Sequence, residues 1–268
     1  MHWLPNDPRF LQVAFLGAFV ITGLGLGIIP WTQAPLTVGA ALLTQAVLGR
    51  PAQATGYLSP AITGLGLTLL LRSDLIWLPP LAAVAAIASK SLLRVKGKHV
   101  FNPANLGLAL AMLLSPHAWA SPSQWGEGTG LLFFFAALGL AVVVKALRSD
   151  ISFAFLLFWV VLKAARVLWL GQRLPVLEHQ LALGSLVVFT FFMISDPKTT
   201  PDSRKGRVLY ALAVAALAFV LQHHFWVMNA PVWALFALSP LVPLLDRLFQ
   251  GHAYRWPALH NLQPAGVP

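Results

Sequence analysis

Apolar segments recur along nearly the whole chain, and this repetition limits the possible folds more than any other feature. Charged residues, proline or glycine divide the sequence into ten such segments, roughly 10–30, 35–49, 57–71, 75–93, 102–115, 130–147, 151–170, 180–195, 207–222 and 230–249. With 58% hydrophobic and 10% charged residues, and a mean hydropathy of +0.75, the chain lies outside the soluble globular range. The sequence therefore predicts one all-α, polytopic membrane domain over residues 1–268, with about ten transmembrane helices.

The basic residues predict how these helices are oriented. If the N-terminus is cytoplasmic, four of the eighteen Lys and Arg residues fall outside, and the rest fall on the cytoplasmic side; the four are Arg72, Lys163, Arg166 and Arg173. Cytoplasmic loops of membrane proteins carry an excess of Lys and Arg. We therefore expect a bacterial inner-membrane protein in contact with lipid, with both termini in the cytoplasm. The net charge of +10 is explained by this topology and does not indicate nucleic acid as a partner.

The cysteine and histidine content narrows the chemistry. Cysteine is absent, which excludes disulfides, thiolate nucleophiles, iron–sulfur clusters and Cys-ligated zinc, and no metal site is expected. Haem held by two histidines needs both at matching depth on neighbouring helices. Haem is not expected here, because the histidines that we considered as ligands stand at segment ends: His99, His117, His179, His223 and His224.

The stretch from Lys96 to Pro116 predicts an unusually short helix. Asn102 is a good N-cap, Pro103 suits the first helical turn, and the apolar run ends at Ser115-Pro116. About a dozen residues at roughly 1.5 Å each cover only about half of a hydrocarbon core roughly 30 Å thick. Transporters place such half-helices at their binding sites. The alternative is an ordinary short span whose ends lie in the membrane interface.

The two halves of the chain, approximately 10–116 and 130–249, resemble each other. Each has a segment that ends in Ser-Asp, then a long span, then a short segment that begins at Asn: the first half uses Asp74 and Asn102, the second Asp196 and Asn229. Five helices per half is an odd number, so the two copies would lie with opposite topology. An inverted repeat is therefore predicted, with Asn229 and Asp74 as candidate residues of a transport path.

A second polar stretch, from Ser195 to Arg207, contains two carboxylates, four hydroxyl groups and four cations in thirteen residues. Pro197 forces an extended or turn backbone at Asp196. The hydroxyl and basic groups could hold a phosphate or the edge of a flavin ring. The alternative is a positively charged cytoplasmic loop with no chemical role.

Three motifs together resemble the RnfD/NqrB family, whose members are RnfD of the Rnf electron-transport complex and NqrB of the sodium-translocating NADH:quinone reductase. The motifs are Thr63-Gly64, Phe101-Asn-Pro-Ala104 after a Lys-rich loop, and Ser195-Asp-Pro-Lys-Thr-Thr-Pro201 before Gly206-Arg-Val-Leu-Tyr210. The resemblance covers roughly residues 35–250. It implies ten helices in two inverted five-helix halves, similar to urea transporters. It also implies electron transfer coupled to Na⁺ or H⁺ movement, a flavin (FMN or riboflavin), and other redox or membrane subunits as partners.

The resemblance implies where a flavin would bind. A non-covalent flavin is expected at Thr63, Asn102, Pro103, Ser195, Asp196, Thr199 and Thr200. The family also attaches FMN to a Thr in a Ser-Gly-Ala-Thr-like motif, and that motif is missing here. Thr129, between Gly128 and Gly130, is in about the right place but lacks the preceding Ala. Non-covalent binding is therefore the prediction, and Thr129 the candidate for covalent FMN.

Three functions are compatible with these observations. The first is an RnfD/NqrB-like electron-transport subunit that binds a flavin and acts as part of an ion-translocating oxidoreductase. The second is a channel or transporter for a small solute, built on the paired half-helices that begin at Asn102 and Asn229. The third is a redox-inactive membrane scaffold, because a shared fold does not establish shared chemistry.

Overall fold

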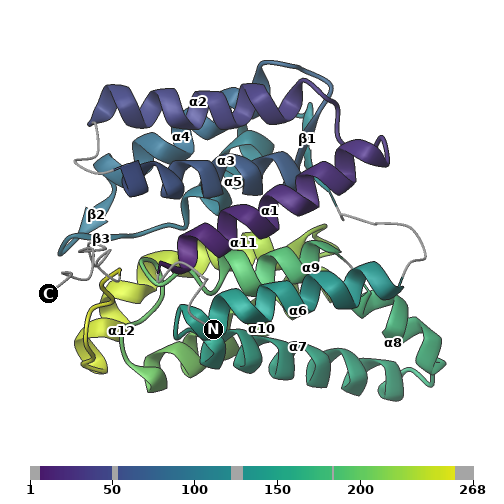
Figure 1. Ribbon diagram of the computed structural model, residues 1–268. Helices are drawn as coiled ribbons and strands as arrows, with labels where there is room; N and C mark the ends of the chain where they lie inside the picture. The colour runs from purple at the N-terminus through teal and green to yellow at the C-terminus, as the bar shows by residue number, and fades with distance from the viewer. Residues whose placement is uncertain (1–6, 50–53, 122–128, 183, 257–268) are drawn as a thin grey trace, which may run out of the picture.

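The computed structural model describes residues 7–49, 54–121, 129–182 and 184–256, and these are mostly helical (Figure 1). Short strands and helical turns connect the helices. The elements, in chain order, are α1 (Pro8–Gly25), α2 (Gln33–Leu48), η1 (Ala54–Tyr57), α3 (Leu58–Leu70), β1 (Leu71–Ser73), α4 (Leu78–Leu92), β2 (Arg94–Val95), β3 (Lys98–His99), α5 (Pro103–Leu114), β4 (Ala118–Ala120), α6 (Thr129–Lys145), α7 (Ser149–Trp169), α8 (Leu174–Leu181), α9 (Gly184–Val188), η2 (Phe189–Met193), α10 (Arg204–His223), α11 (Ala230–Leu238), η3 (Ser239–Leu241) and α12 (Val242–Leu248).

Two short antiparallel ladders mark the two ends of the molecule, an addition to the all-α expectation. At one end β2 pairs with β3, with Arg94 opposite His99; we call this the basic end. At the other, β1 pairs with β4, with Leu71 opposite Ala120; we call this the Asp74 end. Each ladder follows directly on helix ends, where backbone groups that the helix leaves unpaired need partners. The ladders therefore complete helix ends and do not form a separate sheet layer.

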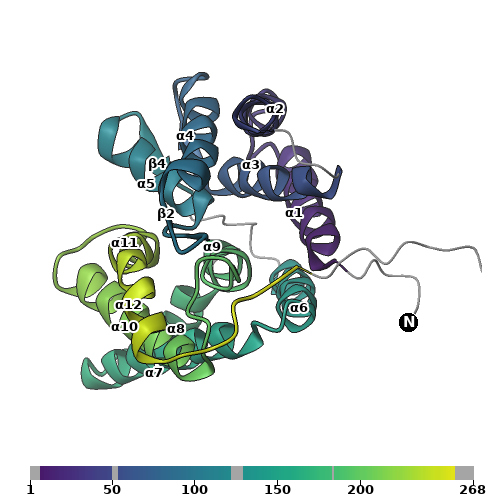
Figure 2. The ribbon, with the colours of Figure 1, turned by 90° about the vertical axis from the view of Figure 1, so that its left-hand side faces the viewer.

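The helices fall into two groups. Figure 2 shows α1 to α5 on one side of the molecule and α6 to α12 on the other. Within the first group α2 packs against α3 and α4, and within the second α10 packs against α7 and α11. The groups meet where α1 lies against α6 and where α5 lies against α11. This interface between the groups positions the candidate site.

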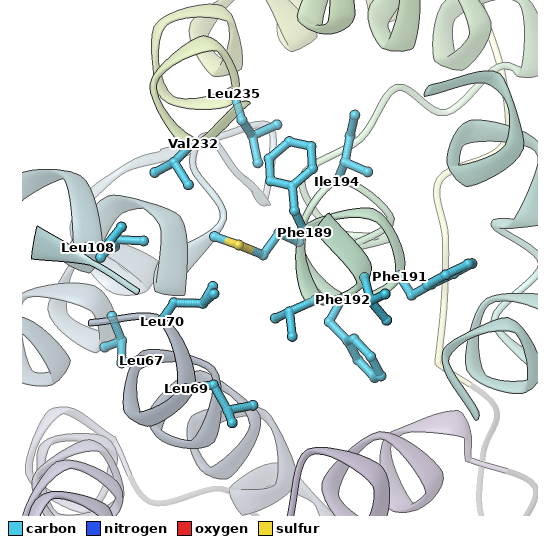
Figure 3. Packing of buried hydrophobic residues seen from close by; sticks show 14 of the residues in the cluster. Leu67, Leu69, Leu70, Leu108, Phe189, Phe191, Phe192, Ile194, Val232 and Leu235 are labelled. Carbon is cyan, nitrogen blue, oxygen red and sulfur yellow. The ribbon is translucent and has the colours of Figure 1, made fainter. Parts of the chain in front are cut away.

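A π-helical turn, η2, lies at the centre of this interface. All five of its residues, Phe189 to Met193, are buried. In Figure 3, Phe189 and Phe192 lie between leucines of α3 and α5 and residues of α11, while Phe191 points away from these leucines. The turn packs closely on α6, because a Cβ added at Gly139 would lie 2.8 Å from the Phe191 side chain. π-helical turns are rare and often occur at functional sites.

The described residues include four helical stretches long and apolar enough to cross a membrane. They are α1, α7, α10 and the continuous run Ala230–Leu248. Helix α8 and the α9–η2 stretch meet at an angle of 56°, and they make a fifth span if they are counted as one. Shorter apolar helices of 10–17 residues make up most of the remainder. The prediction of an all-α membrane protein is confirmed at this level. Ten spans in an inverted repeat, and the likeness to urea transporters, stay predictions.

The short helix at Asn102 has the predicted form. Helix α5 is 12 residues long, Pro103 is its first residue, and Asn102 Oδ1 accepts a hydrogen bond from the Asn105 backbone N–H at 3.0 Å. Asn229 also precedes a helix, but differently. Its backbone is left-handed (φ 53°), it makes no side-chain cap, and its Nδ2 donates to the Ala120 carbonyl at 3.3 Å. The two asparagines thus match in position and differ in local geometry.

Candidate functional site

A cavity of about 270 Å³ lies at the basic end, between the two groups of helices. We call it the Asn102 cavity. Five of the residues predicted to bind a cofactor line it: Thr63, Asn102, Pro103, Ser195 and Asp196. They come from α3, from the start of α5 and from the loop after η2. The fold therefore brings together three stretches that are far apart in the sequence.

Asn102 joins the two groups of helices across this cavity. Its side chain is 5% exposed, and its Nδ2 lies 3.3 Å from both the Met193 carbonyl and Asp196 Oδ2. Because its Oδ1 already caps α5, both ends of the amide are used. Only a side chain with an acceptor and a donor can make both sets of contacts. Asn102 thus fixes the start of α5 relative to the Asp196 loop.

Asp196 organises the loop after η2. Its Oδ1 accepts a hydrogen bond from the Lys198 backbone N–H at 3.0 Å, and its carbonyl accepts one from Thr200 Oγ1 at 3.0 Å. Thr199 Oγ1 contacts the same carbonyl at 3.4 Å. Burial raises the pKa of the Asp196 carboxyl, while the Lys198 N–H and the nearby Lys90 charge oppose this rise. Thr199 and Thr200 thus stabilise the turn, and neither lines the Asn102 cavity.

Lys90 places a buried positive charge in the wall of the cavity. Lys90 is 8% exposed, and its Nζ donates a hydrogen bond to Ser59 Oγ at 2.8 Å. In the described part of the chain no carboxylate lies within 4.0 Å of this ammonium group. Arg94 donates from its Nε to the Lys90 carbonyl, which brings a second cation to the same wall. The cavity therefore favours a ligand with electron-rich oxygen or nitrogen atoms.

His99 also lines the cavity. From the sequence it is a candidate only for haem ligation and not for flavin binding. Its Nδ1 is buried and has no hydrogen-bond partner among the described residues. Burial, together with the charges of Lys90 and Arg94, lowers its pKa to about 4. The imidazole is therefore neutral near pH 7 and keeps one ring nitrogen available to a ligand. Nothing in the local sequence distinguishes it from an ordinary loop histidine.

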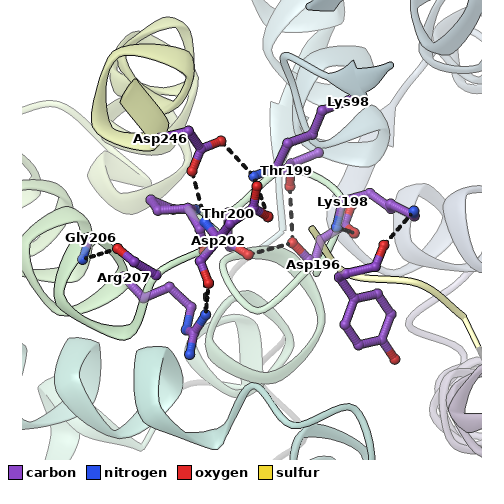
Figure 4. Close-up of polar contacts among 12 residues, drawn as sticks. Lys98, Asp196, Lys198, Thr199, Thr200, Asp202, Gly206, Arg207 and Asp246 are labelled. Carbon is purple, nitrogen blue, oxygen red and sulfur yellow. Dashed lines mark hydrogen bonds and ion pairs between the residues drawn. The ribbon is translucent and has the colours of Figure 1, made fainter. Parts of the chain in front are cut away.

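A second recess, about 290 Å³ in volume, shares His99, Pro197 and Lys198 with the Asn102 cavity. Its charges are largely paired. Lys98 Nζ lies 2.9 Å from Asp202 Oδ1 and 2.8 Å from Asp246 Oδ2, as Figure 4 shows. Asp246 also accepts a hydrogen bond from the Asp202 backbone N–H at 2.8 Å. These contacts hold the loop after η2 against α12 and the β2–β3 ladder. Because its charged groups are paired with one another, we do not treat this recess as a separate binding site.

The remaining predicted residues lie elsewhere. Asp74 is exposed at the Asp74 end, where its Oδ2 lies 2.8 Å from His117 Nδ1. Asn229 lines a different cavity at that end. Thr129 is the first residue of α6, and the stretch 122–128 before it lies outside the described residues. The structure therefore gathers the predicted cofactor residues only in part, at the basic end.

Comparison with known proteins gives the family. Residues 120–255 match the model of the NQR2, RnfD, RnfE family. The chain is 28% identical over 168 residues to a protein of Stutzerimonas stutzeri that is named as the D component of an ion-translocating oxidoreductase complex, a match that covers 58% of this chain and 46% of that protein. A protein of the same name from Marinobacter nauticus is 23% identical over 272 residues, covering 78% of this chain and 76% of its own length.

A third relative of that name, from Tolumonas auensis, is 29% identical over 77 residues, or 29% of this chain and 22% of its own length. The Stutzerimonas and Tolumonas matches thus span less than half of those relatives. The family match includes the Asp196 loop, and it extends over just over half of the chain. On that extent of agreement, this helical membrane protein belongs to the NQR2, RnfD, RnfE family.

Proposed function

We propose that this protein is a membrane subunit of an ion-translocating redox system and holds a flavin, FMN or riboflavin, non-covalently in the Asn102 cavity. One observation carries the proposal. The cavity joins polar groups from α3, the start of α5 and the Asp196 loop, which are the stretches that resemble the flavin-binding family, and Lys90 of α4 completes its wall. Partner subunits, lipid contacts and passage of electrons across or within the membrane are parts of the same proposal.

The residues of the cavity fit a flavin. A volume of about 270 Å³ lies just below the roughly 300–1,000 Å³ of ligand pockets. Apolar side chains, among them Leu16, Val143 and Phe191, line it and suit a flat ring system. When bound, a flavin supplies reversible uptake of one or two electrons.

The polar groups in the wall have distinct roles in this proposal. Lys90 favours negative charge on a bound ring, because its ammonium group has no carboxylate within 4.0 Å among the described residues. His99 provides the unpaired Nδ1 as a hydrogen-bond partner. Asn102 and Asp196 position these groups, because their mutual contact fixes one wall of the cavity against the other.

The proposed membrane topology has ten spans in two inverted halves, approximately 10–116 and 130–249, with the basic end in the cytoplasm. Two contacts support the alternation of helices between the two ends. Gln33, at the start of α2, donates to the Leu71 carbonyl at the Asp74 end at 2.6 Å. Ser59, at the start of α3, meets Lys90, near the end of α4, at the basic end. The positive charge at the basic end agrees with the cytoplasmic excess of Lys and Arg.

The test is a visible absorption spectrum of the detergent-purified protein, supplemented with FMN or riboflavin, before and after acid precipitation. Flavin released into the supernatant supports the proposal. Yellow colour kept in the pellet means covalent attachment instead, with Thr129 the first residue to replace. A colourless protein refutes flavin binding and favours a redox-inactive scaffold or a transporter.

A matched pair of variants assigns the site. Lys90→Met removes the cationic group from the cavity wall, and we expect it to lower the retained flavin at least severalfold. Lys205→Met removes a charge from an exposed position at the start of α10 and should retain flavin as the wild type does. Equal flavin content in both variants would exclude the Asn102 cavity as the binding site.

Solute transport is a second candidate function, favoured by one contact. Asn105, in the first turn of α5, donates from its Nδ2 to the Val232 carbonyl in the first turns of α11 at 3.2 Å, so the two short helices meet near their starts. The test is flux of a small neutral solute in liposomes. Asn102→Asp keeps a good N-cap but changes the charge at the start of α5. Unchanged flux in this variant would count against a transport role.

A further inference from the structure

Lys163 is a buried cation in the last third of the apolar helix α7. The charge count of the sequence places it at the outer side, but it stands six residues before the end of the helix, or about 9 Å of helix length. It is only 1% exposed. Its Nζ lies 2.8 Å from Gln222 Oε1, 3.0 Å from His223 Nε2 and 4.7 Å from the centre of the Trp159 ring. These contacts hold the buried ammonium group against the last turn of α10.

This ammonium group has no counter-ion in the described part of the chain. No carboxylate lies within 4.0 Å of it, and its contacts are an amide oxygen, a ring nitrogen and an aromatic face. Burying a cation without a partner is costly, and lysines in spans usually extend to the interface to avoid that cost. Lys163 is buried nonetheless, so its position is suited to an anion that none of the described residues supplies.

A cavity of about 90 Å³ adjoins Lys163 at the Asp74 end, and we call it the Lys163 cavity. Its other polar residues are Ser121, Gln180, Ser185, Gln222 and Asn229. The Ser185 hydroxyl and the Gln180 amide make no hydrogen bond to any described residue. Apolar side chains such as Leu108 and Phe189 form the rest of the wall.

The start of α11 also faces this cavity, because Ala230, Pro231 and Val232 line it. The N-terminal end of a helix carries partial positive charge and favours anions. Lysine has three donors, and two of the Lys163 donors are used. The third donor, the Ser185 hydroxyl and the Gln180 amide can therefore donate to one small ligand.

We propose that the Lys163 cavity binds a small monovalent anion of the carboxylate class, paired with the Lys163 ammonium group. The volume of the cavity limits the ligand to a few non-hydrogen atoms. This proposal does not depend on flavin binding, because the Asn102 cavity lies at the other end of the molecule and shares one residue, Met193, with this one.

The experiment measures the thermal unfolding midpoint of the detergent-purified full chain during titration with sodium formate. Sodium gluconate, whose anion is too large for the cavity, keeps the ionic strength constant. A ligand that binds only the folded state raises the midpoint, and the shift grows with ligand concentration relative to the dissociation constant. We expect formate to raise the midpoint of the wild type. Formamide, which has nearly the same size but no charge, should not.

Variants locate the effect. Lys163→Met should weaken formate binding at least tenfold, and Ser185→Val should weaken it severalfold. Arg173→Gln removes a charge from an exposed position between α7 and α8, outside the lining of the cavity, and should bind formate as the wild type does.

Two results would overturn the proposal. One is a wild type that gives the same midpoint in formate and in gluconate, or that responds to formamide as strongly as to formate. The other is a formate response that Ser185→Val and Lys163→Met both leave unchanged. The comparison of formate with formamide uses only the wild type, so it holds even if Lys163→Met does not fold.

Discussion

Replacement of Asn102 by Ala should cost about 2–3 kcal/mol of unfolding free energy. The loss has two parts. Removing the cap on the Asn105 N–H costs about 1 kcal/mol. Removing the two 3.3 Å contacts of Nδ2, with the Met193 carbonyl and Asp196 Oδ2, costs about 0.5–1 kcal/mol each, because the acceptors are left buried.

A serine at the same position separates the two parts. Asn102→Ser keeps a capping oxygen but cannot make the contacts of Nδ2, so it should be about 1 kcal/mol more stable than Asn102→Ala. Asn229→Gly is the matched control at the other short helix. Asn229 makes no cap and has a left-handed backbone that glycine adopts readily, so this change should cost less than about 1 kcal/mol.

The assay is equilibrium unfolding in mixed detergent micelles, with helix content followed by circular dichroism. The two-part reasoning is refuted if Asn102→Ala costs no more than Asn229→Gly. It is also refuted if Ala and Ser at position 102 are equally destabilising, because the cap would then contribute nothing.

Three further predictions concern other contacts. Gly139→Ala puts a Cβ 2.8 Å from Phe191 and should cost about 1–3 kcal/mol in the same unfolding assay; an unchanged midpoint would show that the π-helical turn yields easily. Asp246→Asn removes one of the two carboxylates that pair with Lys98, a partly exposed contact, and should cost up to about 1 kcal/mol, less in high salt. Folding lowers the pKa of His99 to about 4, so the contribution of the neutral imidazole to stability is present above about pH 6.5 and is lost as the pH falls toward 4. His99→Gln should therefore flatten the plot of unfolding free energy against pH between about pH 6.5 and 4. Equal slopes for the variant and the wild type would contradict the lowered pKa of His99.

The sequence predicts the membrane class and the start of α5 well, because both depend on local chemistry. Length and apolar content decide whether a segment can lie in a membrane, and Asn102-Pro103 has the residue types that begin a helix. The same logic locates the start of α11 but misses its geometry, because Asn is common both as an N-cap and in the left-handed backbone that Asn229 adopts.

The sequence does not predict which side chains of a membrane helix point into the protein and which point toward lipid. In a soluble helix the polar face marks the outside, whereas here the lipid-facing and protein-facing sides are both apolar. Nothing in the α7 sequence therefore shows that Lys163 points inward. The π-helical turn at Phe189–Met193 is hidden for a similar reason, since its aromatic run would suit an ordinary buried helix equally well. The partners of His99 and Lys90 depend on contacts between distant segments, which no local pattern contains.

The π-helical turn has an electrical consequence. Met193 borders both the Asn102 cavity and the Lys163 cavity, so one residue of this turn stands between recesses that approach each other from opposite ends. Where water enters from both sides, a membrane potential falls mainly over the thin apolar layer that remains. A unit charge that crosses the full potential gains about 2.3 kcal/mol per 100 mV. In the proposed topology Met193 belongs to the layer between the two recesses, so a charge transferred from one recess to the other would sense the part of the voltage that falls across this layer.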